Sequence, residues 1–87
     1  MRREYTIIDE AGLHARPASL LVQAASKFSN DINLEFEGKN VNLKSVLLVM
    51  SLGVPQNSKI FIEVVGDNAE KVFESLEKVL NDHKLIG

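Results

Sequence analysis

The sequence contains no cysteine and no tryptophan, and it has only two prolines among 87 residues. The absence of cysteine excludes a disulfide framework and any thiolate metal site. Zinc would have to be bound by histidine, and His14 and His83 are the only two histidines. Because nothing in the sequence supplies a third ligand, we expect no metal site.

Long apolar runs are absent as well. No stretch approaches the ~20 residues needed to cross a membrane, and no apolar region follows Arg2 and Arg3 as it would in a signal peptide. The formal net charge of −2 argues against a broad electrostatic surface for nucleic acid. The composition, 45% apolar and 25% charged, is ordinary for a globular protein. We therefore expect one cytoplasmic domain, residues 1–87, that neither inserts into a membrane nor binds nucleic acid.

Periodicity predicts four strands and three helices. Alternating apolar and polar residues are typical of half-buried strands, and apolar residues three and four apart are typical of helices with one buried face. In the first half of the chain we expect a strand at 4–8, a helix with Pro17 in its first turn that ends at Asn30-Asp31, and a strand at 32–36. A tight turn at Gly38-Lys39 then leads to a returning strand through Val41 and Leu43. In the second half we expect a helix at 45–52, a strand at 59–65, and a helix at 69–80 capped by Gly66-Asp67-Asn68.

The resulting order, βαββαβα, predicts an α+β fold. Strands with one polar face need apolar cover on the other face, and three amphipathic helices can supply that cover. We therefore expect a two-layer open-faced sandwich, in which a four-stranded, mainly antiparallel sheet is covered on one face by three helices.

The segment Gly12-Leu13-His14-Ala15-Arg16-Pro17-Ala18 holds the main candidate site. His14 comes just before a helix, where free backbone N–H groups and the helix dipole attract anions. Arg16 adds a guanidinium that matches phosphate oxygens. A neutral imidazole can attack phosphorus, and phosphoryl transfer mainly requires alignment and charge neutralisation. The residues therefore suit a phosphoryl carrier, although a histidine at a helix start can also be a simple cap or surface residue.

The short helix at 45–52 is apolar on all sides. Val49 and Leu52 are three apart and can face the core, which leaves Val46, Leu47 and Met50 largely on another face. Leu20 likewise lies off the apolar stripe of its own helix. Exposed apolar clusters of this kind usually mark a partner surface, and the alternative is a more deeply buried helix.

Ser45 directly precedes this short helix and is a good N-cap candidate. The same free N–H groups that a serine caps would also tolerate a phosphate at this position. From the residues alone capping is the favoured interpretation, and phosphorylation stays open beside it.

Two segments resemble the HPr family of the bacterial phosphoenolpyruvate:sugar phosphotransferase system. Residues 12–18 are similar to its active-site signature, and Asn42-Leu43-Lys44-Ser45 with Val49-Met50-Ser51-Leu52-Gly53 resembles its regulatory-serine segment. With the matching order of elements, the resemblance covers essentially the whole chain. The sequence departs from it at Val46-Leu47-Leu48, where many relatives carry Ile-Met-Gly, and in the loop Pro55-Gln56-Asn57.

The resemblance implies a monomeric phosphocarrier without cofactor or independent turnover. Enzyme I would phosphorylate Nδ1 of His14, and the group would pass to enzyme IIA domains of sugar permeases. Arg16 would stabilise the moving phosphoryl group together with the backbone amides of Ala15 and Arg16. Leu20, Leu47 and Met50 would belong to the partner surface, to which the helix faces described above add Val46.

The resemblance also implies regulation at Ser45. HPr kinase/phosphorylase would modify this serine, and the modified protein would act with catabolite control protein A, in hosts that have both. Two other classes of function stay open from the residues alone: a small acylphosphatase-like enzyme that uses Arg16 as its phosphate ligand, and a purely regulatory module that uses the short apolar helix.

Overall fold

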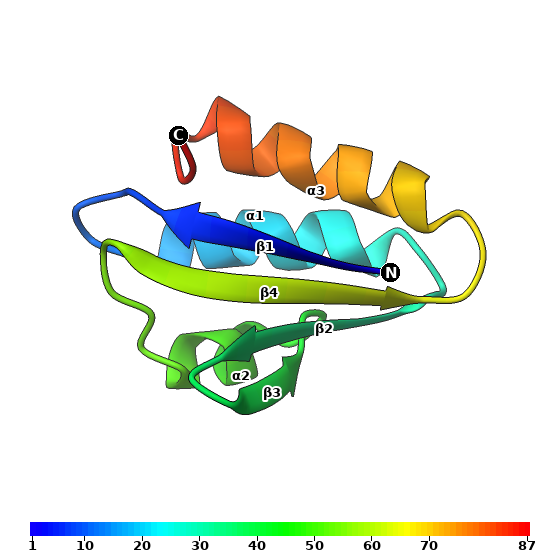
Figure 1. Ribbon diagram of the computed structural model, residues 1–87, viewed down its shortest axis with the longest axis horizontal. Coiled ribbons are helices and arrows are strands. Elements are labelled where there is room, and N and C mark those ends of the chain that lie inside the picture. The colour runs from blue at the N-terminus through cyan, green and yellow to red at the C-terminus, as the bar shows by residue number, and fades with distance from the viewer.

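The computed structural model describes residues 1–87 and confirms the predicted order of elements (Figure 1). The elements are β1 (Arg2–Ile7), α1 (Ala15–Ser26), β2 (Asp31–Phe36), β3 (Lys39–Asn42), α2 (Val46–Ser51), β4 (Ser58–Val65) and α3 (Ala69–Asp82). Most predicted boundaries lie within two residues of these.

The four strands form one sheet in the order β1-β4-β2-β3, and every neighbouring pair is antiparallel. Alternate residues of the two central strands are buried on the helical side, for example Ile32 and Leu34 on β2 and Ile60 and Ile62 on β4. This alternation with period two is what fixes the strand register. The architecture is the predicted α+β open-faced sandwich.

The core between sheet and helices consists of 22 buried apolar residues and contains no buried polar side chain. The predicted stripe of α1 is buried at Ala18, Leu21, Val22 and Ala25, and Phe28 packs against its edge. The stripe of α3 is buried in the same way at Val72, Phe73, Leu76 and Leu80. Helix periodicity therefore identified the buried faces of both long helices correctly.

Three local predictions need correction. Helix α1 ends at Ser26, before the predicted end at Asn30-Asp31, because the N–H groups of Lys27 and Phe28 bond only three residues back, to the Ala24 and Ala25 carbonyls. The turn between β2 and β3 lies at Glu37-Gly38, one residue earlier than predicted, and both residues have positive φ angles of 51° and 78°. Two successive left-handed residues give the turn whose twist matches that of the strands. Asn68 is the N-cap residue of α3, but it has a left-handed backbone and its side chain makes no capping hydrogen bond.

Figure 1 shows that α1 and α3 pack side by side and run in opposite directions. The start of α1 and the end of α3 therefore lie at the same end of the molecule, on the left of the picture. The loop between β1 and α1 closes this end, and it carries His14.

Candidate functional site

Gly12 fixes the loop before α1 against the segment that follows α2. It is buried with a φ of +68°, and a Cβ at this position would overlap the Val54 carbonyl oxygen and lie 2.9 Å from Cα of Pro55. Only glycine combines this conformation with so close a backbone approach. Leu13 strengthens the junction, since its N–H donates to the same Val54 oxygen at 2.9 Å and its side chain is in the core.

His14 is the N-cap residue of α1, with an extended backbone and a side chain that makes no capping hydrogen bond. Its carbonyl oxygen accepts the N–H of Ala18 at 3.0 Å. Pro17 has no N–H, so the free amides of the first turn belong to Ala15 and Arg16. These are the two amides predicted to bind phosphate, and they carry the positive end of the helix dipole. The imidazole stays available for chemistry.

A partly open hollow of about 220 Å³ lies at this end of the molecule. Its lining consists of Asp9, His14, Arg16, Pro17, Leu20 and His83. Four of these residues carry charged or titratable groups, and they come from the β1–α1 loop, the start of α1 and the end of α3. The hollow therefore brings together His14, Arg16 and Leu20 from the predicted site.

Asp9 is the acidic residue whose carboxylate lies within 4 Å of the His14 ring. Its Oδ2 is 3.7 Å from Nε2 of His14, and the exposed fractions of the two side chains are 27% and 42%. Its Oδ1 accepts the N–H of Ala11 at 2.8 Å, and its carbonyl oxygen accepts the N–H of Gly12 at 2.8 Å. The carboxylate is therefore held by its own turn while one oxygen faces the imidazole.

Asp9 was not predicted as a site residue from the sequence, and His83 was only a candidate metal ligand. Asp9 could have been suspected from its position five residues before His14 in a short loop with a glycine. His83 gives no such local indication, because it reaches the hollow through the antiparallel packing of α1 and α3. Although both border the hollow with His14, no group of three or more His, Asp or Glu side chains in this structure could hold a metal ion.

The predicted partner surface lies mainly on α2. Leu47 is 84% exposed, Leu48 45% and Met50 39%, which makes these three the exposed large apolar side chains of the helix. Val49 is buried as predicted, and Val46 is only partly buried and packs against the core. Leu20 lies on α1, is half-buried and lines the hollow. Helix α1 in turn contacts α2.

Ser45 is the N-cap residue of α2, and its Oγ accepts the N–H of Leu48 at 3.3 Å. The capping geometry agrees with the chemistry expected of a serine before a helix. Ser45 does not line the His14 hollow.

None of the helices is both long and apolar enough to cross a membrane.

Comparison with known proteins assigns the arrangement to a class. A family model described as the PTS HPr component phosphorylation site matches residues 1–82. The structure of the histidine-containing phosphocarrier protein of a Mycoplasma has a TM-score of 0.95 at 36% identity and covers 99% of this chain and 98% of its own. The phosphocarrier protein HPr of Bacillus anthracis has a TM-score of 0.82 at 39% identity, covering 91% of this chain and 94% of its own.

A third similar structure is Crh, the catabolite repression protein of Bacillus subtilis, described as an intertwined dimer with a swapped domain. It has a TM-score of 0.71 at 36% identity and covers 85% of each chain. The matched proteins are phosphocarriers and a close variant of them, which defines the class as carrier proteins of a phosphotransferase system. The chain belongs to the HPr family.

Proposed function

We propose that this chain accepts a phosphoryl group on Nδ1 of His14 from phosphorylated enzyme I and passes it to enzyme IIA domains of sugar permeases. The observation that carries the proposal is the position of His14 at the start of α1, beside two free backbone amides and in one hollow with Arg16. Membership of the HPr family supports this choice of partners, and a cytoplasmic location is part of the same proposal.

Arg16 and the amides of Ala15 and Arg16 would neutralise the phosphoryl oxygens. Phosphoryl transfer requires mostly positioning and charge stabilisation, so this set is sufficient for a group that is received and handed on. A carrier of this kind has no turnover without a protein partner and uses no cofactor. This distinguishes it from an acylphosphatase-like enzyme, which would hydrolyse its substrate alone.

The docking surface in this proposal comprises Leu20, Val46, Leu47 and Met50. Exposed Leu47 and Met50 form its apolar centre on α2, and Leu20 extends it to the hollow of His14. A carrier must bind donor and acceptors with its reactive group facing each of them, so one apolar surface beside His14 would serve successive partners.

Phosphorylation of Ser45 by HPr kinase/phosphorylase is the proposed regulation, with catabolite control protein A as the reader of the modified form. A phosphate at Ser45 would add nearly two negative charges at the start of α2. Val46 and Leu47 of the docking surface follow Ser45 within two residues, so the added charge would lie beside that surface and repel an acidic partner.

The decisive experiment for the carrier role is incubation with enzyme I and phosphoenolpyruvate, followed by intact mass measurement. One added phosphoryl group that is lost in acid is expected for the wild type and for His83→Ala, and none for His14→Ala. Each variant removes one histidine side chain from the same hollow, so the two form a matched pair. Labelling of His14→Ala would overturn the assignment, and hydrolysis of acyl phosphate without any partner would favour the enzyme alternative.

We also propose that the chain works as a monomer. Its β1 strand pairs with β4 of the same chain along all six residues, which leaves no element of this sheet to be supplied by a second copy. The Crh structure is described as a swapped dimer, so the fold has that alternative in a relative. Light scattering after size-exclusion chromatography tests the proposal, and a mass of two chains at micromolar concentration would contradict it.

A further inference from the structure

The two carboxylate oxygens of Asp9 contact different groups. Oδ1 accepts the N–H of Ala11 at 2.8 Å, and Oδ2 lies 3.7 Å from Nε2 of His14. The Asp9 carbonyl oxygen also accepts the N–H of Gly12, and Gly12 is locked against the Val54 carbonyl. The carboxylate is thus attached to a rigid turn and presents one free oxygen to the ring.

This orientation determines which ring nitrogen carries the proton. An ionised carboxylate can only accept, whereas a neutral imidazole has one N–H donor and one lone pair. The nitrogen that faces Asp9 is therefore stabilised in its protonated form, which leaves the lone pair on the other nitrogen, Nδ1. At 3.7 Å the attraction is electrostatic, and contacts of this kind often shorten to hydrogen bonds only in the working complex.

The other polar residues of the hollow do not accept the N–H of the His14 ring. Arg16 lines the same hollow, but a guanidinium has no acceptor and cannot receive a proton from the ring. His83 lines it from the end of α3, and Asp9 is the residue whose acceptor oxygen is within 4 Å of the ring nitrogen.

We propose that Asp9 is a positioning residue that holds His14 in the Nε2–H tautomer and so makes Nδ1 the nucleophile. This inference rests on the proposed carrier function and goes beyond it, because it assigns a group that selects the reacting atom. Asp9 acts through His14 and does not itself touch the phosphoryl group.

The transfer step balances with Asp9 in this role. The Nδ1 lone pair forms the N–P bond while the bond between phosphorus and the donor atom breaks, and that electron pair stays with the donor. The proton remains on Nε2, so the phosphorylated ring is cationic and faces the Asp9 carboxylate. When the group leaves for an acceptor, the electron pair of the N–P bond returns to Nδ1 and the ring is neutral again.

The variant Asp9→Asn tests this with little change of shape. An asparagine oxygen can still accept the Ala11 N–H, which places a donating NH₂ group opposite Nε2 and favours the Nδ1–H tautomer instead. Glu10→Gln is the matched control, because it removes one carboxylate from the neighbouring, exposed position of the same loop. Circular dichroism and urea unfolding establish that both variants are folded.

The first measurement uses the unphosphorylated full-length protein and needs no partner. Imidazole ¹⁵N chemical shifts at about pH 9, where histidine is ordinarily neutral, should show mainly Nε2–H in the wild type and in Glu10→Gln. Asp9→Asn should show a clear rise of the Nδ1–H form. An unchanged tautomer ratio in Asp9→Asn would overturn the proposal, whatever the outcome for the carrier function.

The second measurement is the rate of labelling by enzyme I and phosphoenolpyruvate. Asp9→Asn should lower kcat by about 10- to 100-fold, the range seen when the hydrogen-bond partner that orients a metal-bound histidine is removed, with KM nearly unchanged. Asp9→Glu, which restores the carboxylate, should recover part of the rate. Equal kcat values for Asp9→Asn and Glu10→Gln would overturn the positioning role, whereas failure of wild-type labelling would overturn the carrier function itself.

Discussion

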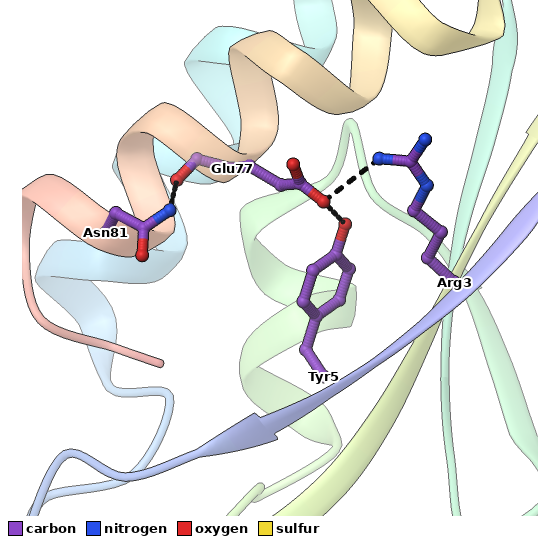
Figure 2. Close-up of polar contacts among 4 residues, drawn as sticks. All are labelled: Arg3, Tyr5, Glu77 and Asn81. Carbon is purple, nitrogen blue, oxygen red and sulfur yellow. Dashed lines mark hydrogen bonds and ion pairs between the residues drawn. The ribbon is translucent and has the colours of Figure 1, made fainter. Parts of the chain in front are cut away.

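Tyr5 on β1 donates a hydrogen bond of 2.6 Å from its hydroxyl to Oε2 of Glu77 on α3, across 72 positions of sequence (Figure 2). Arg3, two residues earlier on the same face of β1, donates to the same carboxylate oxygen at 3.1 Å. Asn81 lies one turn further along α3, and its side chain donates to the Glu77 carbonyl at 3.0 Å. The edge strand of the sheet is thereby connected to the last helix by one carboxylate.

This contact predicts that Tyr5 resists ionisation. Burial raises the pKa of Tyr5 above its ordinary value of 10.0, and the hydrogen bond and negative charge of Glu77 raise it further. A group whose pKa is higher in the folded state stabilises that state fully below its unfolded pKa and loses the effect as pH rises through the folded pKa. Folding stability should therefore decline as pH rises above about 10.

The chain has one tyrosine and no tryptophan, so tyrosinate absorbance reports on Tyr5 alone. The folded protein should begin to ionise at higher pH than the urea-unfolded chain. Glu77→Gln, which keeps an acceptor and removes the charge, should shift the folded titration back toward the unfolded one. Coincident titrations of folded and unfolded wild-type protein would contradict the structure at this contact.

Gly12→Ala should destabilise the fold strongly, since alanine would be strained at a φ of +68° and would overlap the Val54 carbonyl. We expect a loss of about 2–4 kcal/mol in the free energy of unfolding, from left-handed strain together with overpacking. Gly38→Ala is the control, because Gly38 also has a positive φ but an added Cβ would meet nothing within 4 Å. Urea unfolding should show a loss of about 1–2 kcal/mol there, and equal losses at both sites would show that the close approach does not matter.

The contrast between Arg16 and Asp9 shows what the sequence can and cannot predict about the site. His14 and Arg16 are neighbours on one helix start, so local helix chemistry was enough to place them together. The position of Asp9 beside the His14 ring depends on the conformation of the turn after β1. The position of His83 depends on which end of α3 packs beside the start of α1. Periodicity predicted the buried faces of the helices because burial repeats along the chain, but it carries no information on which loops meet.

The short helix α2 illustrates the same limit. Its sequence, VLLVMS, is apolar nearly throughout and has no clear amphipathic pattern. The predicted inward position of Val49 is confirmed, whereas the degree of exposure of Val46 and Leu48 depends on the depth at which the helix packs. The sequence alone could therefore not separate a docking surface from a more deeply buried helix.

Leu47→Glu should weaken binding to enzyme I while leaving the fold intact. Leu47 is 84% exposed, so its replacement should change the free energy of unfolding by no more than about 0.5 kcal/mol. If it is an apolar anchor of the docking surface, the dissociation constant measured by calorimetry should rise at least about tenfold. An unchanged dissociation constant would remove Leu47 from the proposed surface.

Val49→Ala provides the opposite case on the same helix. Val49 is 1% exposed, so loss of its two methyl groups should cost about 2–3 kcal/mol of stability through lost burial and a cavity. Its effect on partner binding should be small at temperatures where the variant stays folded. A stability loss for Leu47→Glu as large as that for Val49→Ala would place Leu47 in the core.

Lys84→Gly should stabilise the protein. Lys84 follows α3 with a φ of 54°, and its N–H donates to the Asn81 carbonyl while the N–H of Leu85 donates to that of Leu80. This is the hydrogen-bond pattern of a Schellman cap, whose left-handed position is usually glycine. Relief of left-handed strain, less the entropy that glycine loses on folding, should give about 0.5–1 kcal/mol.

Lys78→Gly is the matched control for this last prediction, because it makes the same chemical change inside α3. Lys78 is exposed in the helix interior, where glycine should instead cost about 1 kcal/mol. Thermal and urea unfolding of both variants should thus show shifts of opposite sign. Destabilisation by Lys84→Gly would contradict the prediction and would mean that the lysine side chain stabilises this end of α3 by more than its left-handed backbone costs.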